Sequence, residues 1–87
     1  MNKLIKGTTK VHLIVEENDI NKLRTLSKNE LFVFDDDGES PLHYAATNGN
    51  QIICDWLVYK CPELINIRDN EGKTAMDWAR KYNDIKF

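Results

Sequence analysis

Residues 37–50 read DGESPLHYAATNGN, and the order of these residues decides the fold. Gly38 suits a tight turn that needs a positive φ, and Ser40 stands where a helix N-cap is expected. Pro41 then occupies the first helical position, where the missing N–H costs nothing. Small and apolar residues continue the helix until Gly49, a natural stop. The stretch therefore predicts a turn, a capped helix and a glycine stop.

The same order of residues returns elsewhere in the chain. A forward shift of 34 positions places residues 37–42 (DGESPL) on residues 71–76 (EGKTAM). A backward shift of 31 positions places residues 40–43 (SPLH) on residues 9–12 (TKVH), a weaker copy. A period near 33 residues is the length of one hairpin with two helices. The chain is therefore expected to consist of stacked repeats.

The order G-x-[ST]-P-L-H-x-A-A-x-x-G resembles the ankyrin repeat. The T-P-L-H-x-A signature of that family stands here as Ser40, Pro41, Leu42 and His43 followed by Tyr-Ala, with only the threonine replaced. The resemblance implies an all-α solenoid of helix–turn–helix units joined by β-hairpin-like loops. Because outer units must face water, a degenerate first copy is expected.

We expect a tail at residues 1–7 and an ankyrin-repeat domain at residues 8–87, with units at about 8–35, 36–69 and 70–87. The predicted helices are residues 9–17, 19–27, 41–47, 51–59 and 75–82, with hairpin loops at 29–39 and 63–73. A second helix of the last unit has barely begun at residues 84–87. This incomplete unit would leave Trp78 and Met76 partly uncovered, and we expect the chain to be a fragment of a longer protein.

Each predicted first helix opens with a hydroxyl residue and carries a matching side chain three positions later. The pairs are Thr9–His12, Ser40–His43 and Thr74–Asp77. At this spacing the hydroxyl caps the helix while the second side chain reaches back. By resemblance, His43 ties one unit to the next. Asp77 departs from the family pattern, which implies a weaker link or an end-of-array unit.

The composition fits one small domain. The 87 residues carry a net charge of −2 with both signs interspersed, which argues against nucleic acid as the main ligand. No run is apolar enough for membrane insertion. Cys54 and Cys61 without a denser cysteine set fit a reducing compartment, either cytoplasm or nucleus. We expect a monomer, although the uncovered last unit also fits end-to-end self-association.

A catalytic site and a calcium-binding loop both fit the sequence poorly. Ser40, His43 and the acidic residues 35–37 lie close in sequence and could be a catalytic nucleophile, base and carboxylate. Helix capping explains both Ser40 and His43, however, and no oxyanion hole is evident. An EF-hand alignment on Gly38 places Val33 and Tyr44 at the first and last ligand positions, where acids are needed. The acidic run is therefore expected to be a solvated turn. No metal, no cofactor and no catalysis are expected.

The two cysteines and two histidines lack zinc-site spacing. Cys54 is expected to fill the interior face of its helix, as free cysteines commonly do. Cys61, beside Pro62, is expected to be exposed and open to oxidation. A bridge between the two cysteines is not expected within one helix, since seven residues separate their Cα atoms by about 10 Å.

Function then falls on surface recognition of a protein partner. By resemblance, the binding face combines the hairpin tips with the exposed side of the first helices. The predicted contact residues are Phe34, Asp36, Asp37, Glu39 and Thr47 in unit two, and Arg68, Asn70, Glu71, Lys73 and Lys81 in unit three. Phe34 is the strongest of these because aromatic residues are enriched at interface hot spots. An ordinary solvated loop surface would carry similar residues.

Two other functions remain open at this stage. As an alternative, the chain is an accessory tail of a larger protein whose activity lies in another domain. Some acyl-CoA-binding proteins carry ankyrin tails, and residues 62–75 (PELINIRDNEGKTA) would fit among them. A free-standing enzyme is the third class, and it would need a pocket with a perturbed titratable group.

Overall fold

The computed structural model describes residues 9–82, which fold into helices and loops and contain no strand. In chain order the helices are α1 (Lys10–Glu16), α2 (Ile20–Leu23), α3 (Lys28–Leu31), α4 (Pro41–Asn48), α5 (Gln51–Lys60), the 3₁₀ helix η1 (Pro62–Asn66) and α6 (Ala75–Tyr82). The predicted all-α class is confirmed. The predicted tail at residues 1–7 and the predicted helix start at residues 84–87 lie outside the described residues.

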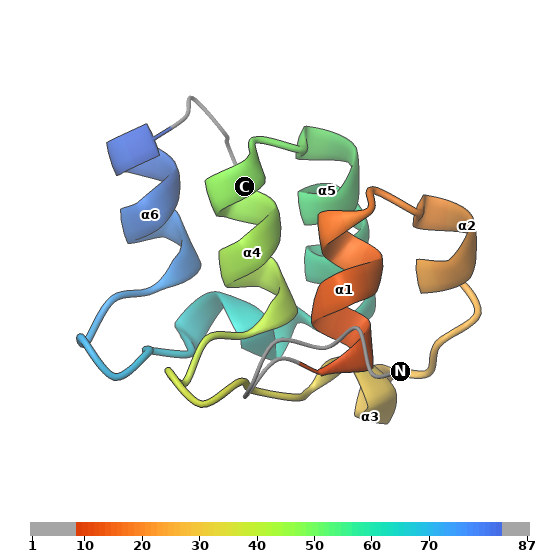
Figure 1. Cartoon of the computed structure of the whole chain (residues 1–87), viewed down its shortest axis with the longest axis horizontal. Coiled ribbons are helices and arrows are strands. Elements are labelled where there is room, and N and C mark those ends of the chain that lie inside the picture. Colours follow the sequence, from red (N-terminus) through yellow and green to blue (C-terminus); the bar gives the residue numbers. More distant parts are fainter. Residues whose placement is uncertain (1–8, 83–87) are drawn as a thin grey trace, which may run out of the picture.

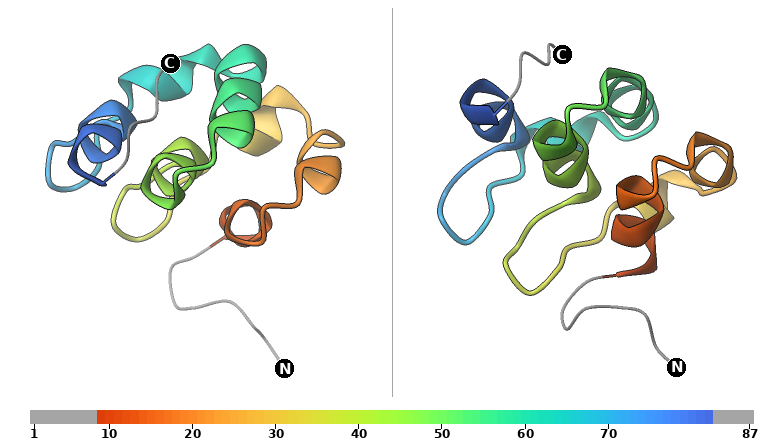
Figure 2. Two further views of the ribbon diagram at one scale, coloured as in Figure 1. Left: turned by 90° about the horizontal axis from the view of Figure 1, so that it is seen from above. Right: turned by 45° about the horizontal axis from the view of Figure 1, so that its top comes forward.

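The helices form two layers. Figure 2 shows α1, α4 and α6 side by side in one row, with α2, α5 and η1 in a second row behind it. Helix α4 is the centre of the first row and packs against α1, α6 and α5. The loops that precede α4 and α6 project from the base of the first row (Figure 1). This is the predicted solenoid of stacked helix–turn–helix units.

A hydroxyl side chain begins each helix of the first row. The hydroxyl oxygens of Thr9, Ser40 and Thr74 each accept a hydrogen bond from the backbone N–H three residues later, at 3.2, 3.3 and 3.3 Å. Gly49 ends α4 in the left-handed region, with φ of 75°. Since each cap is worth about 1 kcal/mol, the three caps fix where the first-row helices start.

The two connecting segments contain more helix than predicted. Residues 29–39 and 63–73 are expected to be loops, but α3 and η1 occupy the beginning of this region in each case. Helix α3 forms because Ser27 and Glu30 make a reciprocal capping box, with bonds of 3.3 and 2.8 Å. The predicted helix at residues 19–27 is accordingly shorter, and only Ile20–Leu23 is α-helical.

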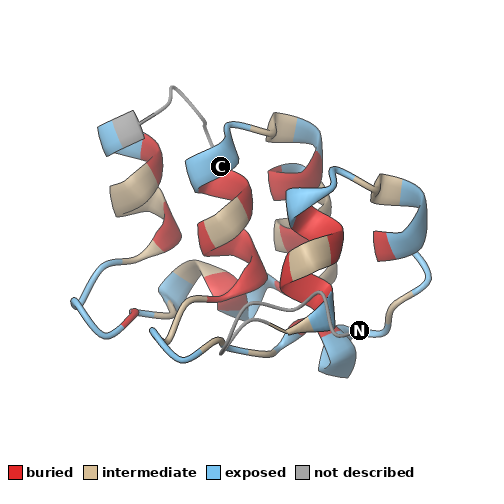
Figure 3. Cartoon of the chain, in the orientation of Figure 1, coloured by how far each residue is buried: buried red, intermediate tan, exposed pale blue. Residues whose placement is uncertain are grey.

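The core lies between the two layers and between neighbouring units. Figure 3 shows that the buried residues occupy the facing sides of the helices. The fully buried large side chains are Val15, Leu23, Leu31, Leu42, Ile53, Leu57 and Leu64, together with His12 and His43. No helix among the described residues has the length and apolar character needed to cross a membrane.

Both cysteines are buried, so the prediction that Cys61 is exposed is wrong. Cys54 is 0% and Cys61 1% exposed, and both belong to the hydrophobic core. Cys61 follows the last residue of α5, and η1 then folds Leu64 into the same core. Burial, followed by the nearby Glu63, raises the pKa of the Cys61 thiol, which disfavours the reactive thiolate.

Candidate partner-binding surface

The first projecting loop, residues 35–40, is organised by the carboxylate of Asp35. Its Oδ1 accepts hydrogen bonds from the backbone N–H groups of Asp37 and Glu39, both at 2.9 Å. Its Oδ2 accepts from the hydroxyl of Tyr44 on α4, at 2.7 Å. Asp35 is half-buried and holds the loop to the helix, so the prediction of a solvated turn is wrong at this residue.

The second projecting loop, residues 69–74, repeats this arrangement 34 positions later. Asp69 Oδ1 accepts from the backbone N–H groups of Glu71 and Lys73, both at 2.9 Å, and Oδ2 accepts from the indole N–H of Trp78, at 2.8 Å. Burial opposes ionisation of Asp69, but the hydrogen bonds from Lys73, Trp78 and Glu71 outweigh it and lower the pKa of this carboxyl. Both loops are hairpins closed by an aspartate.

The two hairpins are joined at their tips. The backbone N–H of Asn70 donates to the carbonyl of Asp37 at 2.8 Å, and its side-chain Nδ2 donates to the carbonyl of Asp36 at 3.1 Å. Gly38, with φ of +77°, makes this approach feasible, because a Cβ there would lie 2.7 Å from Asn70 Oδ1. The tips therefore form one surface rather than two independent loops.

A buried histidine on each of α1 and α4 ties that helix to the hairpin of the next unit. His12 Nε2–H donates to the carbonyl of Glu39 at 2.7 Å, and His43 Nε2–H donates to the carbonyl of Lys73 at 2.9 Å. Because a carbonyl only accepts, both rings carry their proton on Nε2. His43 Nδ1 then accepts from the backbone N–H of Ser40, at 3.0 Å. The degenerate first unit thus keeps the same link as the second.

The last unit replaces the histidine by Asp77. Its Oδ2 accepts from the backbone N–H of Thr74 at 2.9 Å, which completes a capping box. Its other oxygen lies 3.3 Å from a guanidinium nitrogen of Arg80 on the same helix. Within the described residues Asp77 stays local, whereas the two histidines reach the next unit.

The joined tips carry a concentrated negative charge. Residues 35–39 and 68–73 hold six carboxylates and two cations, Arg68 and Lys73. Burial and then the nearby carboxylates of Asp35, Asp69, Asp37 and Glu71 together raise the pKa of Glu39 to about 7. One carboxyl of this surface therefore titrates near neutral pH.

A profile of the family described as "Ankyrin repeats (3 copies)" matches residues 11–87. The chain belongs to the ankyrin-repeat family. Ankyrin repeats are in general protein-interaction modules, and the family assignment agrees with the resemblance found in the sequence.

Two known proteins illustrate the likeness. The human "Ankyrin repeat domain-containing protein SOWAHB" is 32% identical over 77 residues, a match that covers 79% of this chain and 10% of that protein. A chain in the solved structure of the Bd0816 predatory endopeptidase from Bdellovibrio bacteriovorus in complex with the immunity protein Bd3460 matches with a TM-score of 0.70 and 29% identity. That match covers 91% of this chain and 42% of the other. The chain spans less than half of either relative.

The predicted contact residues fall into three groups on the ankyrin fold. Six lie at the hairpin tips: Asp36, Asp37, Glu39, Asn70, Glu71 and Lys73. Phe34 and Arg68 instead line a shallow cavity between the connecting segments of neighbouring ankyrin units. Thr47 and Lys81 lie near the C-terminal ends of α4 and α6, away from the tips. The structure therefore brings the tip residues together but separates the rest.

Three aromatic residues near these groups were not predicted as contacts. Phe32 packs edge-to-face on Phe34, with ring centroids 4.9 Å apart. Tyr44 and Trp78 are half-buried at equivalent positions of α4 and α6, and Lys81 Nζ lies 5.4 Å from the Trp78 ring centroid. The 34-residue shift that places Tyr44 on Trp78 is the signal that marks them as a pair in the ankyrin repeats.

The structure also bears on the nucleophile–base hypothesis for this ankyrin chain. Ser40 and His43 are both 0% exposed. The Ser40 hydroxyl oxygen accepts from the backbone N–H groups of Leu42 and His43, at 3.2 and 3.3 Å, and the histidine is bound at both ring nitrogens. Neither side chain is accessible to a substrate. Among the described residues, no group of three or more metal-ligating side chains converges.

Proposed function

We propose that this chain is a protein-binding module without catalytic activity, whose partner contacts the hairpin tips and the exposed side of α4 and α6. The observation that carries the proposal is the joined pair of tips. Asn70 fixes one hairpin against the other through the carbonyls of Asp36 and Asp37, so the tips present a preorganised surface. Preorganisation lowers the entropic cost of binding.

The charge of this surface favours a partner with a basic patch. Asp36, Asp37 and Glu71 are exposed, and Glu39 is half-buried among them. Complementary charge increases the association rate and selects against acidic partners. Lys81, at the far end of α6, adds a positive charge to the proposed face. A partner that reaches this end of α6 would present an acidic group there.

The coverage of the known relatives favours a second, compatible function. The match spans 10% of the human relative and 42% of the structural relative, so similar ankyrin segments are parts of longer chains. In that case the chain is an accessory region that recruits a protein to a domain elsewhere, such as an acyl-CoA-binding domain. We propose cytoplasm or nucleus as its location, because both cysteines are free.

The double variant Asp36→Lys/Glu39→Lys tests the binding face. It reverses charge at the tips without altering the backbone groups that join them. We expect proteins that co-purify with the wild-type chain to be lost or weakened at least tenfold, with an unchanged circular dichroism spectrum. The measurement is affinity capture with mass spectrometry, followed by titration of the purified partner.

Asp55→Lys is the matched control, because Asp55 is exposed on α5, in the second row of helices. This variant should retain the partner. Capture that survives the double variant would place the binding face elsewhere, and capture lost equally in the control would show that only net charge matters.

A further inference from the structure

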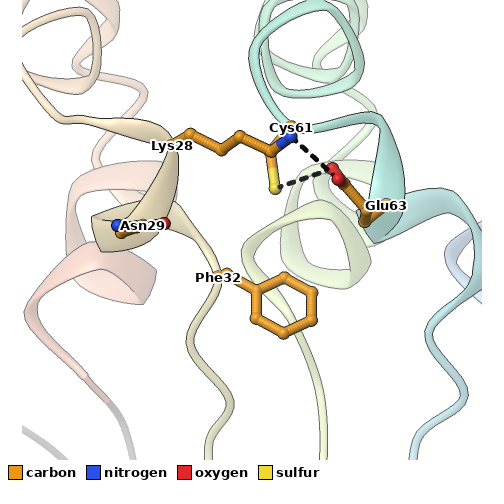
Figure 4. A pocket seen from close by; sticks show the side chains of 5 residues that line it. All are labelled: Lys28, Asn29, Phe32, Cys61 and Glu63. Carbon is orange, nitrogen blue, oxygen red and sulfur yellow. Dashed lines mark hydrogen bonds and ion pairs between the residues drawn. The ribbon is translucent and has the colours of Figure 1, made fainter.

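Two cavities lie between the two connecting segments, residues 28–38 and 61–68, and we refer to them together as the groove. The first cavity, about 410 Å³, is lined by Lys28, Asn29, Phe32, Cys61 and Glu63. Figure 4 shows the Phe32 ring between α3 and the start of η1, below the ion pair that joins Lys28 to Glu63. The ion pair, 2.8 Å long, lies at this end of the groove, with both side chains about half exposed.

The second cavity, about 480 Å³, is lined by Phe34, Gly38, Asn66, Ile67 and Arg68. It lies on the hairpin side of the first, where Gly38 and the joined tips begin. Both volumes are within the range that holds a bulky apolar side chain or a small ligand. The groove therefore leads from an ion pair to the acidic tips, with one cavity beside each of two phenylalanines.

Phe32 and Phe34 form an exposed aromatic pair between the cavities. They are 43% and 39% exposed, although their rings pack together at 4.9 Å. The residues between and after them, Val33 and Asp35, are turned inward and are half-buried. This alternation is that of an extended chain, in which side chains two residues apart lie about 7 Å from each other on one face.

The backbone beside this pair is also available. No backbone hydrogen bond joins the N–H or C=O groups of Val33 or Phe34 to any part of the chain that the structure describes. An added extended segment gains affinity from such groups and specificity from cavities that accept alternate side chains. The two exposed aromatic rings and these backbone groups are therefore available for contact with a partner.

The charges at the tip end of the groove indicate which side chain a bound peptide would place there. The tip end of the groove is followed by Asp36 and Asp37, both exposed. Arg68, the cation that lines the second cavity, donates from its guanidinium to the carbonyl of Gly72 at 2.9 Å, so its charge lies over the second hairpin. A basic side chain on the occupant would therefore meet carboxylates at the tip, about two residues beyond the second cavity.

We propose that the groove binds an extended peptide segment of the partner with the pattern apolar–x–apolar–x–Lys/Arg, read from the ion-pair end toward the tips. The apolar side chains enter the cavities beside Phe32 and Phe34, and the basic side chain pairs with Asp36 and Asp37. This inference rests on the proposed protein-binding function and names the chemistry of the segment that is bound.

Selection of a random seven-residue phage-displayed library on the whole 87-residue protein tests the inference. We expect selected sequences to place two apolar residues two positions apart and a lysine or arginine two positions further on, in either chain direction. Synthetic fluorescent peptides of the selected sequences then serve as the probe. Phe32→Ala/Phe34→Ala should weaken their binding at least tenfold, and Asp36→Lys should weaken it several-fold.

Tyr59→Ala is the matched control, because Tyr59 is an aromatic residue with 76% exposure on α5 that lines neither cavity. It should leave peptide binding unchanged. Failure to select any sequence, selection without the two-residue spacing, or equal binding by the double alanine variant would overturn the inference. The proposed function would survive each of these results if the tip variant Asp36→Lys/Glu39→Lys still loses the folded partner.

Discussion

The two hairpins, residues 35–40 and 69–74, share one backbone design but carry different side chains. In each, an aspartate accepts two backbone N–H groups at 2.9 Å and the polar hydrogen of an aromatic residue on the next helix. In each, the carbonyl four residues after that aspartate accepts a histidine Nε2–H from the preceding unit. At that carbonyl position the first hairpin has Glu39 and the second has Lys73.

The comparison separates what the fold requires from what it leaves free. The link between units uses only the carbonyl oxygen of Glu39 or Lys73, so the side chain can be acidic in one hairpin and basic in the other. The aspartates, by contrast, are fixed by several hydrogen bonds each. We therefore expect partner recognition to depend on the side chains that vary between the hairpins, and stability to depend on the groups that both hairpins share.

Loss of the histidine link is expected to produce the largest effect. His43→Ala removes the bonds to the Lys73 carbonyl and the Ser40 N–H and opens a cavity, because the ring is 0% exposed. Unpaired buried groups cost about 1–3 kcal/mol each, so we expect a destabilisation of about 3 kcal/mol. Urea unfolding monitored by circular dichroism measures it.

His12→Ala is the matched variant, and we expect a smaller loss of about 2 kcal/mol. His12 makes the same type of bond, but α1 packs mainly against α4 and α2 at one end of the described row, whereas α4 lies between α1 and α6. Small and equal effects of the two variants would contradict the role of the histidines as links between units.

Substitution of the two tip glycines compares the hairpins again, with a smaller expected change in the free energy of unfolding. Gly38 and Gly72 have nearly the same φ, +77° and +76°, so alanine is strained at both, by about 1 kcal/mol. Only at Gly38 would the added Cβ clash, at 2.7 Å from Asn70 Oδ1, whereas nothing lies within 4 Å at Gly72. We expect Gly38→Ala to cost about 1 kcal/mol more than Gly72→Ala in the same unfolding assay. Equal costs would show that the tips are not tightly joined.

Much of the fold follows from local sequence signals. Ser40, Pro41 and Gly49 mark the start and stop of α4, and α6 has the predicted bounds because Thr74 repeats the same cap. The missed helix α3 carries a readable signal, the S-x-x-E capping box of Ser27 and Glu30. The burial of Cys61 was not readable, because it depends on how η1 turns back toward the core.

The candidate surface could be predicted less well from the sequence, because it depends on contacts between residues 30 or more positions apart. The sequence places Asp36, Asp37 and Asn70 on hairpins, but not the hydrogen bonds that join them. It marks Phe34 as an aromatic contact, but the packing of Phe32 on it and the cavity with Arg68 depend on the stacking of two units. Asp35 and Asp69 look like surface acids until their three hydrogen bonds are seen.

The difference between Glu39 and Lys73 gives the smallest expected effect, a pH dependence confined to the first hairpin. Burial and the surrounding carboxylates raise the pKa of Glu39 from 4.5 to about 7, so folding favours the protonated form. That contribution is complete below pH 4.5 and is lost as the pH rises through about 7. Because the side chain is partly exposed, we expect a loss on the order of 1 kcal/mol.

Glu39→Gln removes the contribution of this carboxyl to the pH dependence of stability, because glutamine keeps the shape of the side chain and does not titrate. The stability of the variant relative to the wild type should rise by that amount between pH 5 and pH 8, as measured by urea unfolding at each pH. The difference between the two proteins also removes the contribution of His12. Burial lowers the pKa of this histidine, so the unfolded chain takes up the proton first and the folded state loses stability as the pH falls below 6.5. Lys73→Gln at the equivalent position of the second hairpin should show no such rise. If the stability difference between Glu39→Gln and the wild type did not change with pH, the Glu39 carboxyl would be better solvated than its position among Asp35, Asp69, Asp37 and Glu71 suggests. The negative potential at the joined tips would then be weaker than the proposed binding of a basic partner requires.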